Sequence, residues 1–320
     1  MLWRGCRMLR PDADPGEGDM RRVVGLAVIG SLLATVLAGC ANPAGVDGSL
    51  TDDWKAQPEA TSFVPESGVC HLSLPDGQLI SRAQYNPLDC GVDHHYETVH
   101  IGQFTGSEKD AAGPPEKGSP GARKAFDECN TKVSEYLGGD WRGGRLDLFI
   151  YYPAKEAWEG GSRWFRCDLA EVQSLDDNAK ISRRSGNLKD ILKASFPMAY
   201  GCFRAILSSD KKDITAMNPV TCETAHGAEF AGVWTAPESS YADFEKNTQR
   251  AHDACRSIVA KWAKVPSDSN LRYRTGTIIY FPDEEEWADG DRGVQCFMWI
   301  SDQDLRRSMK GAGPGALRIR

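Results

Sequence analysis

Residues 152–167 of the chain read YPAKEAWEGGSRWFRC, and residues 281–296 repeat the pattern as FPDEEEWADGDRGVQC. An aromatic residue followed by Pro, then a Glu, a Trp, a Gly, an Arg and a final Cys recur at a constant shift of 129 residues. Rare residues that keep one register over such a distance indicate an internal duplication. The sequence therefore predicts two copies of one unit.

The repeat extends outward from these stretches. Cys90-x3-His94-x2-Glu97 matches Cys222-x3-His226-x2-Glu229 at a shift of 132 residues. Eight cysteines fall into two sets of four, which are Cys70, Cys90, Cys129 and Cys167, then Cys202, Cys222, Cys255 and Cys296. Each set of four cysteines lies within one predicted domain. The first domain is predicted at residues 62–172 and the second at 195–305, with a linker at 173–194 between them.

The periodicity within each copy predicts its fold. Apolar residues recur at three- and four-residue steps between Ala125 and Leu137 and between Ala251 and Trp262, which predicts one amphipathic helix per copy with a Cys facing inward. Runs rich in β-branched and aromatic residues predict strands over 69–74, 97–104, 146–152, 164–169, 276–281 and 294–300. We expect an α+β fold made of two tandem small disulfide-stapled domains, each a short antiparallel sheet covered by one helix.

The N-terminal residues indicate export. Arg21 and Arg22 precede an uncharged, mostly apolar run at residues 23–38, which is typical of a signal peptide and too short to span a bilayer comfortably. The run ends in Leu-Ala-Gly-Cys, which resembles a bacterial lipobox, so Cys40 is the expected lipidation site. Acyl chains such as palmitate would anchor the protein to the cell membrane on its extracytoplasmic face.

The remaining segments are predicted to lie outside the two domains. Residues 1–40 form the signal peptide with its lipobox, and we expect the true start at Met20, which makes Cys6 an artefact. Residues 41–61 are rich in Ala, Gly, Pro and Asp and are predicted to be a flexible tether. Residues 306–320 are Gly-rich and basic and are predicted to be a disordered tail.

Composition narrows the function classes. The chain has 320 residues, 38 Lys plus Arg, 45 Asp plus Glu and a formal net charge of −7. This balance argues against a nucleic-acid partner, because a phosphate backbone requires a clustered excess of basic side chains.

An exported chain with four cysteines per domain is expected to form two disulfides in each. Zinc is disfavoured because no two cysteines have the close spacing of zinc modules. Four cysteines allow three pairings, and we expect the strand cysteines to pair and the helix to be tied to a strand, which gives Cys70 with Cys167, Cys202 with Cys296, Cys90 with Cys129, and Cys222 with Cys255.

The order Gly-x-Cys, Cys-x3-His-x2-Glu, a helical Cys, Tyr/Phe-Pro, Trp, Gly-x-Arg and a final Cys resembles the septum formation domain family of actinobacterial envelope proteins. The second copy is the closer match, since Ser162 replaces the family's Asp in the first. Neither copy has Pro before its His, because Asp93 and Ala225 stand there. The resemblance implies a small envelope domain with a division-linked role and transfers no catalytic residue.

Four residues in each copy are candidate binding residues, namely His94, Glu97, Trp158 and Arg163, then His226, Glu229, Trp287 and Arg292. A His and a Glu three residues apart could form a metal or acid/base pair. We favour a structural role, with each His donating to a main-chain carbonyl, because one His and one Glu lack a third zinc ligand. Each Arg could bind an anion, but stacking on the Trp or a buried ion pair is favoured.

These observations predict a membrane-anchored extracytoplasmic binding or scaffold module of the cell envelope that is linked to septum formation. Its expected partners are the membrane, through the lipid anchor, and envelope or division proteins or the cell wall. The alternative is a small-ligand or metal-binding lipoprotein that uses the Cys-x3-His-x2-Glu motif. We expect no enzyme, cofactor or metal, since nucleophile-elbow, phosphate-loop and dinucleotide patterns are missing from both domains.

Overall fold

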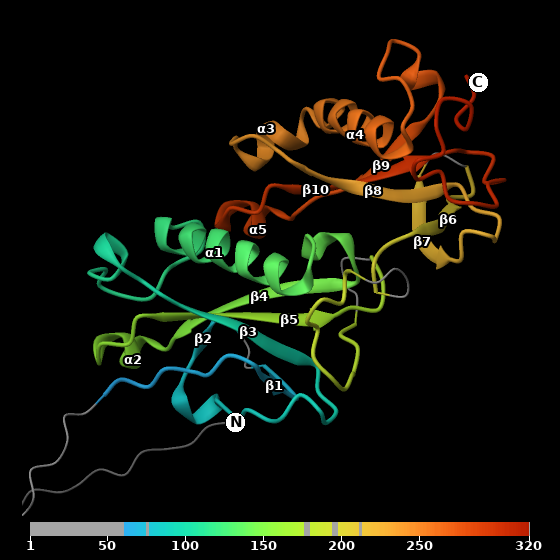
Figure 1. The fold of residues 1–320 in the computed structure, drawn as a ribbon. Helices are drawn as coiled ribbons and strands as arrows, with labels where there is room; N and C mark the ends of the chain where they lie inside the picture. The colour runs from blue at the N-terminus through green and yellow to red at the C-terminus, as the bar shows by residue number, and fades with distance from the viewer. Residues whose placement is uncertain (1–60, 75–76, 176–179, 194–197, 211–212, 320) are drawn as a thin grey trace, which may run out of the picture. The chain divides into compact units, whose positions relative to one another are not determined.

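The computed structural model describes residues 61–319 apart from 75–76, 176–179, 194–197 and 211–212. The predicted signal peptide, the lipidation site Cys40 and most of the predicted tether lie outside the described residues. The described chain is an α+β fold with two five-stranded sheets (Figure 1). The α+β prediction is therefore confirmed. None of its described helices is long and apolar enough to cross a membrane.

The first sheet has the strand order β1-β3-β5-β4-β2. Its strands are β1 (Val69–His71), β2 (Leu79–Ile80), β3 (Tyr96–Gln103), β4 (Leu146–Pro153) and β5 (Trp164–Glu171). The pairs β1–β3, β3–β5 and β5–β4 are antiparallel, whereas β2 pairs with β4 in parallel. The expectation of a purely antiparallel sheet is therefore wrong at this edge, where a strand of two residues was too short to recognise from the sequence.

The second sheet has the strand order β7-β6-β8-β10-β9 and is antiparallel throughout its described pairs. Its strands are β6 (Cys202–Leu207), β7 (Ile214–Val220), β8 (Ala228–Thr235), β9 (Gly276–Tyr280) and β10 (Gly293–Trp299). The strand β7 contains Pro219, which lacks an N–H group and is tolerated because β7 is an edge strand.

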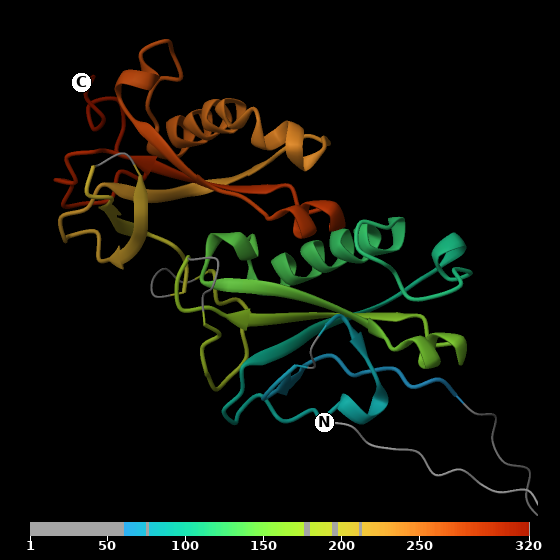
Figure 2. The same cartoon turned by 180° about the vertical axis from the view of Figure 1, so that it is seen from behind.

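One long helix covers a face of each sheet (Figures 1 and 2). Helix α1 (Pro120–Leu137) begins after Ser119, whose hydroxyl accepts a hydrogen bond from the Ala122 N–H, and ends at Gly138 with a φ of 77°. Helix α4 (Thr248–Ala263) covers the second sheet. Short helices complete the fold, namely α2 (Lys155–Glu159), α3 (Tyr241–Glu245) and α5 (Glu284–Asp289), with 3-10 turns η1 (Arg82–Gln84), η2 (Gly106–Glu108), η3 (Trp141–Gly143) and η4 (Leu271–Tyr273).

The predicted apolar faces form the cores. In the first core, Cys129 and Val133 of α1 are fully buried and belong to the same cluster as Phe165 of β5. In the second, Cys255 and Val259 of α4 are fully buried, with Cys296 of β10 in the same cluster as Cys255. The helical periodicity in the sequence therefore identified the face that each helix buries.

All eight cysteines of the described residues form disulfides, but the expected pairing is wrong. The bonds are Cys70–Cys90, Cys129–Cys167, Cys202–Cys222 and Cys255–Cys296, with Cα–Cα distances of 5.1 to 5.4 Å. Strand β3 lies between the strands of Cys70 and Cys167, and β8 lies between those of Cys202 and Cys296. Strands two apart are separated by roughly 9.5 Å, which exceeds the reach of a disulfide. Each helix cysteine instead bonds to a strand of the sheet that its helix covers, β5 in the first sheet and β10 in the second.

The predicted linker and tail take part in the cores. Leu188, in the predicted linker, is 1% exposed and packs in the first core. Met309 and Leu317, in the predicted disordered tail, are 3% and 1% exposed and pack in the second core. The Arg274 guanidinium donates to the Leu317 carbonyl at 2.9 Å. These segments have isolated apolar residues without a period, so periodicity alone could not reveal their burial.

Candidate functional site

The motif around His94 is buried at the entry to β3. The His94 ring is fully buried, and its Nδ1 donates to the Val92 carbonyl at 2.8 Å. The Glu97 carboxylate is 1% exposed and accepts hydrogen bonds from the Tyr136 hydroxyl and from the Leu188 N–H, the latter at 2.7 Å. Glu97 therefore holds the segment 184–188, the first closing segment, whose Arg184 also forms a β-bridge with His94.

The second motif repeats this role with different partners. The Nδ1 of His226 donates to the Thr224 carbonyl at 2.7 Å, and its Nε2 lies 3.2 Å from Glu229 Oε1. Glu229 also accepts hydrogen bonds from the Ser308 hydroxyl and the Met309 N–H. It thereby holds the second closing segment, residues 305–309.

The pKa of His226 follows from these contacts. Burial lowers it, but the hydrogen bonds to Glu229 and to the Thr224 main chain and the Glu229 charge outweigh burial, so the pKa lies above its usual value. His226 and Glu229 are 0% and 1% exposed. Within the described residues, Glu229 also comes within metal-ligand distance of Cys202 and Cys222, but these sulfurs are bonded to each other. The geometry supports the structural interpretation of both motifs.

The candidate arginines stack on the candidate tryptophans. The Arg163 guanidinium lies 4.3 Å from the centre of the Trp158 ring, and Arg292 lies at the same distance from Trp287. Both guanidinium groups also donate to main-chain carbonyls of the turn that carries the tryptophan. The favoured stacking is confirmed, and it ties each short helix, α2 or α5, to the strand that follows it.

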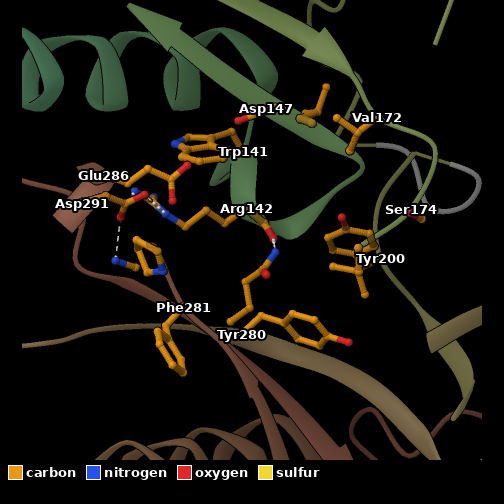
Figure 3. A pocket seen from close by; sticks show the side chains of 15 residues that line it. Trp141, Arg142, Asp147, Val172, Ser174, Tyr200, Tyr280, Phe281, Glu286 and Asp291 are labelled. Atoms are coloured by element: carbon orange, nitrogen blue, oxygen red, sulfur yellow. Dashed lines mark hydrogen bonds and ion pairs between the residues drawn. The ribbon is translucent and has the colours of Figure 1, made fainter. Parts of the chain in front are cut away.

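A cleft that the sequence did not reveal lies where η3, β4 and Tyr200 face β9, α5 and the start of β10 (Figure 3). Its volume is about 200 Å³. Its walls carry four aromatic side chains, three carboxylates and one guanidinium, which are Trp141, Tyr200, Tyr280, Phe281, Asp147, Glu286, Asp291 and Arg142. None of these was among the candidate residues, because they come from distant parts of the chain and share no spacing.

A buried ion pair closes one end of the cleft. Arg142 and Asp291 side chains are 7% and 5% exposed, and the Arg142 Nη2 lies 2.5 Å from Asp291 Oδ1. Figure 3 shows Arg142 extending toward Asp291, with Tyr200 and Tyr280 on the other side. Arg142 also donates to Asp140 at 3.1 Å, and its carbonyl accepts from Gln295 at 2.7 Å.

The other two carboxylates of the cleft have perturbed pKa values. Burial raises the pKa of Asp147 to about 6, and the charges of Asp291 and Asp283 add to the shift. Glu286 is an exposed residue of α5 that lines the cleft. Desolvation of its carboxyl group and the charges of Asp283, Asp147 and Asp291 raise its pKa to about 7, against the opposing hydrogen bond from the Asp283 N–H. The cleft can therefore interact with charged groups in a pH-dependent way.

Comparison with family models matches residues 67–296 to the family described as septum formation. No curated protein and no solved structure matches the chain. The match covers more than two thirds of the chain and runs from just before β1 to Cys296 in β10, so both sheets contribute to it. The chain therefore belongs to the septum formation family.

Proposed function

We propose that the protein is a lipid-anchored, extracytoplasmic binding module of the cell envelope with a role in septum formation. The observation that carries this proposal is the family match over residues 67–296. The signal peptide expected from the sequence would direct export of the protein, and the expected lipobox would provide a lipid anchor at Cys40. The four disulfides support the same compartment, because such bonds persist in oxidising environments outside the cytoplasm.

We further propose that the two sheets are tandem copies of one unit. Strands β1, β3, β5 and β4 stand in the same order as β6, β8, β10 and β9, and the fifth strand is added at opposite edges. Each unit has a helix-to-strand disulfide and a Glu that holds a closing segment. The two copies provide binding surfaces for envelope or division proteins or for the cell wall rather than a catalytic centre, because the repeated polar residues are consumed by structural contacts.

The position of the protein in dividing cells tests the proposal. A fluorescent fusion that matures in an oxidising compartment is imaged for the wild type, for Cys40→Ala and for Ser49→Ala, a control substitution in the predicted tether. We expect the wild type and Ser49→Ala to fractionate with the membrane and concentrate at the septum. Cys40→Ala is expected to lose membrane retention. Even labelling of the envelope with normal septation in a deletion strain would contradict the division role, and membrane retention of Cys40→Ala would contradict the anchor.

A further inference from the structure

The cleft between η3 and α5 is large enough for a side-chain-sized ligand. Its volume of about 200 Å³ is roughly fifteen times the space that one water molecule needs. The walls combine apolar surface from Leu146 and Val172 with the rings of Tyr200 and Tyr280. Ligand sites commonly place polar groups beside apolar walls, and in this cleft the polar groups contribute the larger share of the accessible lining.

The charges in the cleft are unbalanced. Arg142 is already paired with Asp291 and Asp140, so it does not compensate the remaining carboxylates. Asp147 accepts a hydrogen bond from the Leu148 N–H at 2.8 Å, and Glu286 accepts one from the Asp283 N–H at 2.9 Å. No ion pair joins either of them to a basic side chain of the described chain. Burial, and to a smaller extent the charges of neighbouring carboxylates, raises the pKa of both. A cation between them would relieve this repulsion.

The aromatic side chains favour an organic cation over a bare ion. Aromatic faces attract ammonium and guanidinium groups, and an alkyl stem gains from contact with the apolar walls. The cleft already shows this preference, since the Arg142 guanidinium lies 4.4 Å from the centre of the Trp141 ring.

We propose that this cleft binds the ammonium or guanidinium group of a lysine or arginine side chain presented by a polypeptide partner. The cation would lie against the carboxylates of Asp147 and Glu286, with its stem along the tyrosines. The inference is independent of where the protein is located in the cell, so a failed septum experiment leaves it standing and its own failure leaves the septum proposal standing.

Binding is measured on the full chain in detergent by titrating capped Gly-Lys-Gly and Gly-Arg-Gly peptides and following the indole N–H resonance of Trp141 by NMR. Gly-norleucine-Gly is the neutral control with a similar stem. Pentylammonium, which has the charged group and an alkyl stem but no peptide main chain, tests whether the polypeptide contributes to binding. We expect millimolar binding of the two basic peptides, as is usual for one isolated side chain. The norleucine peptide should bind at least about tenfold more weakly.

Charge-neutral variants locate the site. Asp147→Asn combined with Glu286→Gln should weaken peptide binding by about tenfold or more while leaving the fold intact, because the change relieves repulsion. Glu285→Gln is the matched control, since Glu285 is on the same helix but pairs with Lys117 outside the cleft. Equal binding of the norleucine peptide, no loss in the double variant, or tighter binding of pentylammonium than of the peptides would overturn the proposal.

Discussion

Acidification is expected to destabilise the first sheet through His71. The His71 side chain is 3% exposed on β1, and its Nε2 lies 3.1 Å from the Thr98 hydroxyl. Thr98 donates in turn to Asp168, which pairs with Arg166 at 2.7 Å. Burial and the Arg166 charge lower the pKa of His71 to about 4, against a weaker opposing hydrogen bond to the main chain. The folded protein therefore holds His71 neutral.

The magnitude follows from the difference between the folded and unfolded pKa values. The unfolded value is near 6.5 and the folded value is about 4. Below pH 6.5 the His71 imidazole is protonated in the unfolded chain but remains neutral in the folded chain. The unfolding free energy therefore falls as the pH drops, and the His71 contribution stops changing below pH 4. At about 1.4 kcal/mol per pKa unit, the loss of unfolding free energy reaches about 3 kcal/mol.

Urea unfolding of the disulfide-intact protein at pH 6.5 and at pH 4 measures this loss. Other groups titrate in the same range, so the test is the difference between the wild type and His71→Gln, which has no imidazole at this position. We expect the wild type to lose about 3 kcal/mol more than the variant between the two pH values. His95→Gln, in the same segment, serves as the matched control and should behave like the wild type. Parallel losses in the wild type and His71→Gln would refute the reasoning.

Two further substitutions test the packing. Arg142→Ala should lower the unfolding free energy by about 3–5 kcal/mol, because it leaves the Asp291 carboxylate buried without its partner. Adding Asp291→Asn should restore part of the stability if the unpaired carboxylate is the cause. A loss below about 1 kcal/mol would exclude this cause. Met309→Ala should lower the unfolding free energy by about 2–5 kcal/mol in the same urea assay, because this side chain is buried in the second core. Arg307→Ala, at an exposed position, should change it by less than about 0.5 kcal/mol. Equal effects of the two substitutions would show that residues 306–320 are disordered, as the sequence predicted.

The sequence predicted those parts of the fold that have a period or a repeat. The steps from Ala125 to Leu137 placed α1 and its buried face, because helix geometry brings every third or fourth residue to one side. The recurrence of a Glu after each His marked positions with the same role. The pattern could not reveal what the Glu side chains contact. An Arg-Arg-Ser run occurs at residues 183–185 and again at 306–308, but it stands at different distances from the N–H groups that donate to the Glu side chains, those of Leu188 and Met309.

The disulfide pairing and the cleft depend on tertiary arrangement and were therefore beyond reach. The pairing requires the order of strands in the sheet, which the spacing of four cysteines does not determine. The cleft brings together residues from Trp141 to Gln295, and none of them shares a spacing that carries chemistry. The hydrophobic pattern also failed to predict that Leu188 and Leu317 are buried. Their own main-chain groups are held by long-range hydrogen bonds, the Leu188 N–H to Glu97 and the Leu317 carbonyl from Arg274.

The proposed copies differ at the positions that create the cleft. With the shift of 129 residues, Asp291, Gly293 and Gln295 correspond to Ser162, Trp164 and Arg166. A side chain at position 293 would collide with Arg142, since a Cβ there would lie 2.1 Å from its Nε.

In the first sheet, the side chains at the corresponding positions make contacts within the first sheet and its flanking segment. Trp164 is buried and donates to the Phe63 carbonyl, and Arg166 pairs with Asp168. In the second sheet the Asp, the Gly and the amide of Gln295 accommodate Arg142, the middle residue of η3. The middle residue of η4, Arg272, is exposed beside Tyr273. In the proposed duplication the two copies therefore differ in role, since residues of the second sheet accommodate Arg142, which lies in the turn just before β4 of the first.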